Sequence, residues 1–194
     1  YNELGRRDNI YKARIKILVH ELGIEKFKEL VEFNFQKFKD KRLDLGSKFI
    51  NQTKAFFSLP NLKIKQRSVT FPEDIDFNNW LIRNVVKHKI KGYSIVLISL
   101  KQNGKPPGDA TSDQMRKIAA ISQEFSFSEI RVTHEQNLVL PHIENSRLYE
   151  VWAQLKKSGL ATPNLGFISD TICCPGMDYC ALATARSIPI SNKI

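Results

Sequence analysis

Apolar residues recur at helical spacing in two stretches near the start of the chain. The first runs from Asn9 to Leu22 and is followed by Gly23, a residue type that commonly ends helices. The second runs from Glu25 to Phe38. The pattern predicts two amphipathic helices, with the phenylalanines of the second on its core face. The apolar positions are Ile10, Ala13, Ile17, Leu18 and Leu22 in the first stretch and Phe27, Leu30, Val31, Phe35 and Phe38 in the second.

The next part of the chain, residues 39–70, is polar and irregular and contains Pro60. Polar stretches interrupted by proline are typical of connectors. We expect one further helix inside this connector, around Phe49–Phe57, and a short loop leading into a helix over Glu73–Trp80.

The middle of the chain alternates between strand and helix patterns. Runs rich in Ile and Val are typical of strands, and Thr or Ser before a helical run typically caps the helix. In chain order we expect a strand at Tyr93–Leu100, a helix capped by Thr111 or Ser112, strands at Ile130–Thr133 and Leu138–Leu140, a helix at Leu148–Leu155 ending near Gly159, and a strand at Leu165–Ile168. This β-α-β-β-α-β order is the split βαβ, ferredoxin-like arrangement. The sequence therefore predicts an α+β fold in which a helical segment precedes a ferredoxin-like repeat.

The three cysteines of the chain lie close together, in the segment CCPGMDYC. Pro175 and Gly176, between Cys174 and Cys180, predict a tight turn with exposed backbone amides. If Asp178 caps a helix, Cys180 lies in the first turn of that helix, where the helix dipole favours thiolate over thiol. Such an environment suits a metal ligand or a redox thiol.

The residues alone leave three interpretations of the cysteines open. The thiols are metal or cluster ligands, or they are buried and inert apolar side chains, or, less favoured, Cys174 and Cys180 form a disulfide. An iron–sulfur cluster takes about four thiolates and structural zinc takes about four N or S ligands, so this chain cannot complete a thiolate set alone. The histidines do not complete one either, because His20, His88, His134 and His142 are not in zinc-ligand spacing.

Basic residues are concentrated in the first hundred residues, which carry +9 of the net charge of +10. A basic surface attracts polyanions or acidic proteins, or simply keeps a protein in solution. A stand-alone basic module that binds nucleic acid or an acidic protein, with structural cysteines, is therefore the alternative function, although no nucleic-acid-binding motif accompanies the charge. No apolar run of about eighteen residues is present, so we expect no membrane span. The basic clusters are Lys63, Lys65 and Arg67, and Arg83, Lys87, Lys89 and Lys91.

Four segments together resemble the sulfite and nitrite reductase hemoprotein family: CPGMDYCALA, GRRDNIYKARIKILVHELG, GDAT and RVTHEQNLVLPHI. The resemblance runs over nearly all of the chain and is weakest from about Glu25 to Trp80. It implies an interior to C-terminal fragment of a longer enzyme in which sirohaem is bridged to a [4Fe–4S] cluster. A start at Tyr1 instead of Met fits such a piece.

The resemblance also implies a division into three domains. Residues 1–72 would be the helical, basic part of a sirohaem-binding domain, and residues 73–160 the ferredoxin-like half-domain. Residues 161–194 would be the truncated start of the second domain that binds sirohaem and [4Fe–4S].

The family supplies candidate site residues. Two of its cluster cysteines are separated by five residues, as Cys174 and Cys180 are, and a second pair follows further along the chain. That second pair is absent here, so Cys174 and Cys180 are the expected metal ligands. Sirohaem carries eight carboxylates, which arginine binds well. The expected cofactor-binding residues are Arg7, Arg14, Lys16, Arg131 and Gln136.

Neighbours of these candidates carry two further expectations. Lys12 should share a helix face with Lys16, four positions later. Thr133 and Asn137 are expected to fix the hairpin around Gln136 instead of contacting cofactor.

The implied reaction is the six-electron reduction of sulfite to sulfide or of nitrite to ammonia, with the catalytic residues upstream of Tyr1. An acidic donor such as ferredoxin or a flavoprotein would supply the electrons. We expect the isolated chain to retain neither sirohaem nor the cluster and to be inactive, because half of the thiolates are missing. No membrane or nucleic-acid partner is expected, and the cytoplasm is the expected location.

Overall fold

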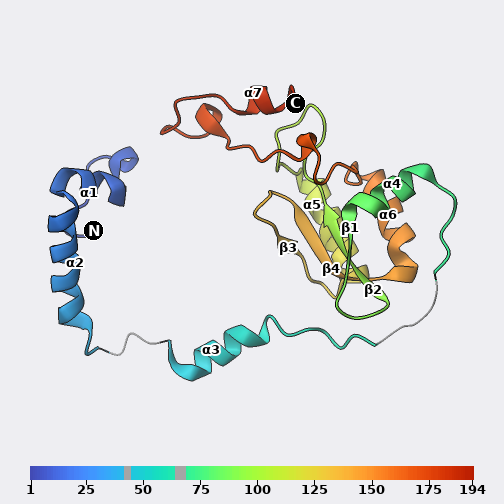
Figure 1. The fold of residues 1–194 in the computed structure, drawn as a ribbon, viewed down its shortest axis with the longest axis horizontal. Helices are drawn as coiled ribbons and strands as arrows, with labels where there is room; N and C mark the ends of the chain where they lie inside the picture. Colours follow the sequence, from blue (N-terminus) through green and yellow to red (C-terminus); the bar gives the residue numbers. More distant parts are fainter. Residues whose placement is uncertain (42–44, 64–68) are drawn as a thin grey trace. The chain divides into compact units, whose positions relative to one another are not determined.

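The computed structural model describes residues 1–41, 45–63 and 69–194. These residues form two compact units, residues 1–59 and residues 60–194. Figure 1 shows the helices of the first unit in blue and cyan and the mixed fold of the second in green to red. Within the described ranges, no helix combines the length and the apolar character that crossing a membrane requires.

The first unit is helical. Its elements are the 3₁₀ helix η1 (Ile10–Lys12) and the helices α1 (Ile15–Leu22), α2 (Ile24–Phe38) and α3 (Gly46–Ala55). Gly23 separates α1 from α2 with φ at +77°, a conformation that favours glycine. Helices α2 and α3 confirm the helices predicted at Glu25–Phe38 and around Phe49–Phe57.

Three expectations for this unit are wrong. The single helix over Asn9–Leu22 is split into η1 and α1, because Arg14 adopts an extended backbone with φ −131° and ψ 139°. Lys12 and Lys16 therefore do not share a helix face. The phenylalanines of α2 are not core residues either, since no residue of α2 is buried. Phe33, Phe35 and Phe38 are among its exposed side chains.

The second unit is built around an antiparallel sheet. Its strands are β1 (Val85–Lys87), β2 (Tyr93–Ile98), β3 (Arg131–Val132) and β4 (Leu138–Glu144), in the order β1-β2-β4-β3. Its helices are α4 (Ile75–Asn84), α5 (Ser112–Phe125), η2 (Asn145–Arg147), α6 (Leu148–Lys157), η3 (Ile168–Asp170), η4 (Gly176–Asp178) and α7 (Ile188–Ser191). Because β4 pairs antiparallel with both β2 and β3, β2 and β3 run parallel with β4 between them. This is the split βαβ arrangement, and the predicted α+β, ferredoxin-like class is confirmed.

The prediction of a last strand at Leu165–Ile168 is wrong. That stretch is a turn leading into η3, and Gly166 has φ at +76°, which breaks an extended strand. The sheet edge beside β2 is taken instead by β1, whose Val85 pairs with Val96. The chain thus reaches this edge from α4, before the repeat, and not after it.

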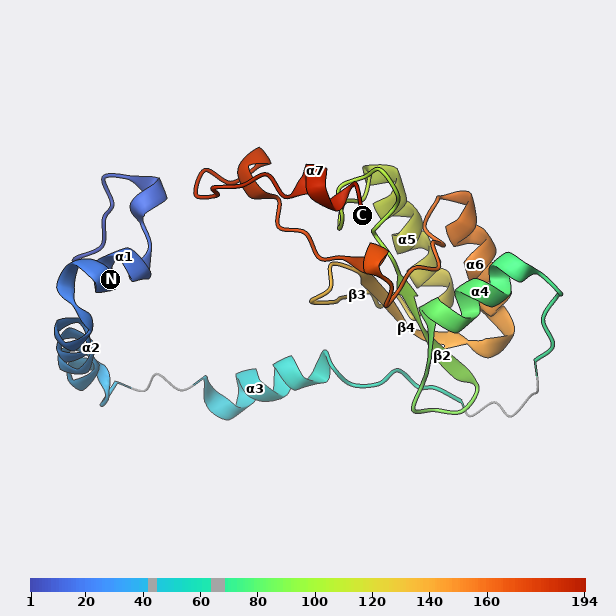
Figure 2. The same ribbon diagram turned by 45° about the horizontal axis from the view of Figure 1, so that its top comes forward.

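Helices α5 and α6 pack against the sheet and close the core, as Figure 2 shows. Helix α5 begins with a capping box, in which the Thr111 hydroxyl accepts from the Gln114 N–H at 3.2 Å and the Thr111 N–H donates to Gln114 Oε1 at 3.0 Å. Thr111 is therefore the cap, one of the two residues predicted. The fully buried core side chains include Phe77, Trp80, Ile98, Ile118, Ile121, Leu140, Ile143 and Leu155.

Candidate functional site

The turn between β3 and β4, residues 133–137, is fixed by its own threonine. The Thr133 hydroxyl accepts from the backbone N–H groups of Glu135 at 3.2 Å and Asn137 at 3.1 Å. Gln136 has φ at +58°, an uncommon value for a residue with a side chain. The hydrogen bonds support the expected structural role of Thr133 in this turn, which we call the β3–β4 turn.

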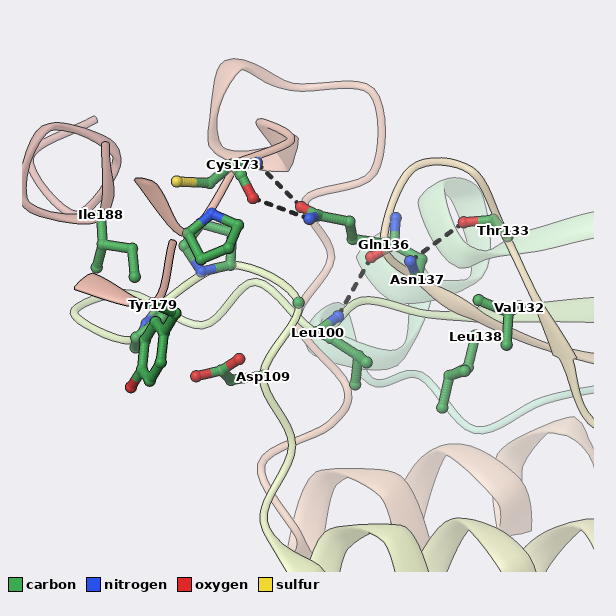
Figure 3. Close-up of a pocket in the computed structure, with 14 residues that line it drawn as sticks. Leu100, Asp109, Val132, Thr133, Gln136, Asn137, Leu138, Cys173, Tyr179 and Ile188 are labelled. Atoms are coloured by element: carbon green, nitrogen blue, oxygen red, sulfur yellow. Dashed lines mark hydrogen bonds between the residues drawn. The ribbon is translucent and has the colours of Figure 1, made fainter. Parts of the chain in front are cut away.

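Gln136 joins this turn to the cysteine segment, residues 171–180. The Gln136 side chain donates from Nε2 to the Cys173 carbonyl and accepts at Oε1 from the Cys173 N–H, both at 2.9 Å (Figure 3). A side-chain amide thereby makes the paired hydrogen bonds that a neighbouring strand would make with the backbone. Of the predicted candidates, Gln136 is thereby bonded to Cys173, the residue next to Cys174 in the chain.

A buried ion pair holds the same turn to the chain just before the cysteine segment. Lys101 Nζ lies 2.6 Å from Asp170 Oδ1, and the two side chains are 1% and 11% exposed. Asn137 Nδ2 donates to the same Oδ1 at 3.0 Å, and the Gly166 N–H donates to Oδ2 at 3.1 Å. Lys101 also donates to the backbone carbonyl of Glu135. Burial acts to raise the pKa of Asp170, but the hydrogen bonds from Lys101 and Asn137 outweigh burial and hold that pKa below its ordinary value.

A cavity of about 690 Å³ lies between the β3–β4 turn, the Pro106–Asp109 loop and the cysteine segment. Figure 3 shows Val132 and Leu138 at one end of it, and Asp109 and the Tyr179 ring at the other. The cavity is mostly apolar with a few polar groups, which is the usual character of a small-molecule site.

The three cysteines are free thiols with different surroundings. Cys173 is buried, Cys174 is exposed and Cys180 is half-buried. A disulfide between Cys174 and Cys180, the less favoured interpretation, does not occur in this structure.

The prediction of a helix beginning at Asp178 is wrong. The chain instead makes the short 3₁₀ helix η4, and the Cys180 N–H donates to the Gly176 carbonyl at 2.9 Å. Gly176 has φ at +62°, and its backbone packs so tightly that an added Cβ would lie 2.6 Å from the Ala185 oxygen. Because Cys180 follows a turn and not an α-helix cap, the helix dipole does not act on its thiol.

The described residues do not complete a metal or cluster site. Among them, no group of three or more His, Cys, Asp and Glu side chains could hold a metal ion. A [4Fe–4S] cluster takes about four ligands, whereas the chain has three cysteines, of which one is buried. The chain does not fit a whole cluster, although Cys174 and Cys180 are thiols that could belong to a larger ligand set.

The predicted basic residues lie in different places. Arg7, Arg14 and Lys16 are exposed in the first unit, and Arg7 donates to Asn2 Oδ1 at 2.7 Å. Arg131 lies on β3, where its Nε donates to Glu129 Oε1 at 2.6 Å. Of the two basic clusters, Lys65 and Arg67 lie outside the described residues. In the other cluster, Arg83 stacks on Phe167, with the guanidinium carbon 4.0 Å from the ring centroid.

Sequence reasoning missed a hydrogen-bonded chain of two buried histidines and a half-buried glutamate. His88 Nε2 lies 3.1 Å from His142 Nδ1, and His142 Nε2 lies 3.1 Å from Glu129 Oε2. The Ile90 N–H donates to His88 Nδ1 at 2.9 Å, so the His88 proton is on Nε2 and every ring nitrogen in the chain has a partner. Lys101 and Asp170 were also missed. A lysine directly after the Ile- and Val-rich strand was the available signal for Lys101, and Asp170 had none.

Two family models match the chain. The "Nitrite and sulphite reductase 4Fe-4S domain" matches residues 1–38, and the "Nitrite/Sulfite reductase ferredoxin-like half domain" matches residues 103–158. The second match runs from the loop before α5 to the end of α6. The first covers the basic helical part, which contains no cysteine.

Curated relatives match over nearly the whole chain. The ferredoxin–nitrite reductase of Zea mays is 27% identical over all of this chain and 30% of its own length. That of Betula pendula is 26% identical over all of this chain and 29% of its own length. A ferredoxin-dependent sulfite reductase of Mycolicibacterium paratuberculosis is 25% identical over 96% of this chain and 28% of its own length.

The chain thus spans less than a third of the length of these relatives. Among solved structures, the Mycobacterium tuberculosis NirA protein aligns with a TM-score of 0.49 and 21% identity, over 97% of this chain and 29% of that one. The resemblance predicted from the sequence motifs is confirmed by the matches to both family models and by the relatives. The chain carries matches to two domains of the nitrite and sulfite reductase family and is similar to part of its members.

Proposed function

We propose that this chain is part of a reductase that uses sirohaem and a [4Fe–4S] cluster to reduce nitrite to ammonia or sulfite to sulfide. The observation that carries the proposal is the order of the matches. A 4Fe-4S domain match on residues 1–38 and a ferredoxin-like half-domain match on residues 103–158 occur in one chain. The bound cofactors would supply the electron transfer.

Cys174 and Cys180 would be two of the cluster ligands in the longer protein. Their exposure supports this assignment, because one thiol is exposed and the other half-buried, whereas Cys173 is buried. The remaining ligands would come from outside this chain. We therefore propose that the isolated chain keeps neither cofactor and has no reductase activity.

The basic residues of the first unit are the proposed partners of the sirohaem carboxylates. Arg7, Arg14 and Lys16 are exposed, so their charges are available to an anionic macrocycle. Arg131 is a weaker candidate because its guanidinium already binds Glu129. The Gln136 amide is likewise engaged, with the backbone of Cys173.

Substrate, donor and location remain part of the proposal. Relatives are named as ferredoxin-dependent nitrite or sulfite reductases, and the basic first half of this chain suits an acidic donor such as ferredoxin or a flavoprotein. We propose the three-part division at residues 72 and 160 and a cytoplasmic location on the same grounds, although the plant relatives are named chloroplastic.

The test uses the longer protein that this proposal requires, purified without oxygen. We expect a sirohaem absorption band, iron with acid-labile sulfide, and reduction of nitrite or sulfite by reduced methyl viologen. Cys174→Ser and Cys180→Ser should each abolish the labile sulfide and the activity. Cys173→Ser is the matched control and should retain both.

The same assays on residues 1–194 alone should show no cysteine-dependent cluster after anaerobic reconstitution with iron and sulfide. A stable [4Fe–4S] cluster on the isolated chain would contradict the proposed half-site. A longer protein in which Cys174→Ser keeps its cluster would contradict the ligand assignment.

A further inference from the structure

The β3–β4 turn contacts the chain at two points around the cysteines. The first point is the Lys101–Asp170 ion pair. There Asn137 donates to the Asp170 carboxylate, and the Glu135 carbonyl accepts from Lys101. Gln136 binds both backbone groups of Cys173 at the second. Three consecutive residues of one turn thus fix the position of the chain that enters the cysteine segment.

Side-chain exposure alternates along this part of the segment. Ile172 is exposed, Cys173 is 6% exposed and Cys174 is exposed again. Alternation of this kind is what an extended chain produces when one face is against the protein. A slip of one residue would exchange the two faces, burying the Cys174 thiol and exposing the Cys173 thiol.

We infer that Gln136 is a positioning residue that sets the register of the cysteine segment, so that Cys173 faces inward and Cys174 is the accessible thiol of the adjacent pair. The amide suits this role because it offers a donor and an acceptor side by side, which matches the C=O and N–H of one residue. Shifted by one position, the segment would place Ile172 or Cys174 opposite the amide, and shifted by two it would place Pro175 there. Pro175 has no N–H to donate, so a shift that brings it to Gln136 cannot keep both bonds.

The surroundings of Gln136 favour this single orientation. Gln136 Cβ and Cδ would lie 3.2 and 3.4 Å from a Cβ added to Gly108, so the adjacent loop packs closely against the side chain. The Gln136 backbone is held at φ +58° by the hydrogen bonds of Thr133 within the turn. A residue kept in such a conformation needs the support of its neighbours.

The consequence for chemistry rests on the proposed function, in which Cys174 is a cluster ligand and Cys173 is not. The register itself is a property of the chain without any cofactor. It can therefore be measured separately from reductase activity.

The experiment measures thiol reactivity toward 4,4′-dithiodipyridine in two single-cysteine backgrounds of residues 1–194. One background keeps Cys173, through Cys174→Ser and Cys180→Ser, and the other keeps Cys174, through Cys173→Ser and Cys180→Ser. With Gln136 intact, the reaction of Cys173 should be slower than that of Cys174 by a factor of about ten or more, because burial restricts access to the thiol.

Gln136→Ala should accelerate Cys173 by about tenfold to a hundredfold, the factor that two net hydrogen bonds supply, and should leave Cys174 nearly unchanged. The matched control is Gln102→Ala, because Gln102 also donates from its amide to a backbone carbonyl, that of Gly159, away from the cysteine segment. That control should leave Cys173 slow.

Gln136→Glu separates positioning from mere packing. Below the ordinary glutamate pKa of about 4.3, the protonated acid again offers a donor and an acceptor, whereas above it the carboxylate repels the Cys173 carbonyl. Cys173 in this variant should be protected at about pH 3.5 and reactive at about pH 7, which lie below and above that pKa. Both rates are compared with that of Cys174 and with the chain that keeps Gln136 at the same pH.

Equal reactivity of the two cysteines with Gln136 intact, or a Cys173 that stays slow in Gln136→Ala, would overturn the inference. A Gln136→Glu variant without any pH dependence of the Cys173-to-Cys174 ratio would do the same. If the register result holds while Cys174→Ser keeps its cluster in the longer protein, the positioning stands and the proposed ligand role fails.

Discussion

Single residues have large effects on the stability of the second unit, and Lys101 and Asp170 are the strongest case. Both side chains are nearly buried, and their 2.6 Å contact is supported by Asn137 and Gly166. Removing one partner of a buried pair leaves the other without compensation, which costs more than the pair contributes.

Lys101→Met should therefore lower the free energy of unfolding by about 3–5 kcal/mol. Urea denaturation followed by circular dichroism measures this loss. Lys105→Met is the control, because Lys105 is exposed on the same loop. Combining Lys101→Met with Asp170→Leu should recover part of the stability. If Lys101→Met alone loses no more stability than Lys105→Met, the role given to the pair is contradicted.

The burial of His142 predicts how stability depends on pH. Burial lowers the pKa of His142 below its ordinary value and outweighs the opposing effect of Glu129, while His88 and Arg131 add to the lowering. The unfolded chain then binds a proton that the folded chain refuses. Stability is complete above the ordinary histidine pKa of about 6.5 and falls as the pH drops below it, by up to about 1.4 kcal/mol per pH unit.

This slope should be shallower in His142→Asn, when the free energy of unfolding is measured between pH 7.5 and pH 5, a span about one unit above and below the ordinary pKa. His134→Asn should keep the full slope, since the His134 side chain is 90% exposed. Identical slopes in both variants would show that another group is responsible.

Elements, at the next scale, are placed by what surrounds them as much as by their own sequence. The short strand β1 fills the sheet edge that the stretch around Gly166 cannot fill. Between β2 and β4 the register shifts, so that Ser94 pairs with Ile143 and Val96 with Leu140. This bulge lets Leu140 and Ile143 both be buried in the core although they are three positions apart.

The loop after the cysteine turn depends on Gly176. Gly176→Ala should weaken the closure at Ala185, because the added Cβ would lie 2.6 Å from the Ala185 oxygen that accepts from the Met177 N–H. Amide hydrogen exchange at Met177 should rise by about tenfold, which corresponds to the 1–2 kcal/mol of a side chain at positive φ.

Gly104→Ala is the control, because it makes the same change at another glycine with positive φ. Gly104 has φ at +74° and nothing within 4 Å of an added Cβ, so this variant carries the strain alone. It should leave exchange at Met177 unchanged. Equal exchange in wild type and Gly176→Ala would mean that the closure does not depend on this glycine.

The whole molecule divides into units of unequal cores. The second unit, residues 60–194, holds a cluster of buried apolar side chains from α4, the sheet, α5 and α6. In the first unit, Leu18 is the buried residue among those whose side chains are described. A compact unit with its own core can fold alone.

Residues 60–194 expressed alone should keep the cooperative thermal unfolding of the full chain, with a midpoint within a few degrees of it. Residues 1–59 alone should show no cooperative transition, because little apolar surface is buried to offset the loss of chain entropy. Calorimetry of the two pieces checks both statements, and an unfolded 60–194 piece would contradict them.

Local sequence patterns determined the elements with strong local signals. The helices α2, α5 and α6, the cap at Thr111 and the strand β2 all follow from periodicity, capping residues and β-branched runs, whose effects act within a few positions of the chain. The sequence motifs indicated the resemblance to the nitrite and sulfite reductase family, and the spacing of Cys174 and Cys180 indicated the proposed cluster ligands.

Only the tertiary structure decided how these pieces meet. Three residues of β1 are too few for a periodic signal, and their strand exists because β2 offers an open edge. The bonds of Gln136 to Cys173 and of Lys101 to Asp170 join positions 37 and 69 residues apart, so no local pattern could show them. Which thiol is buried follows from those distant contacts, because the same extended segment could present either face until the β3–β4 turn holds it in one register.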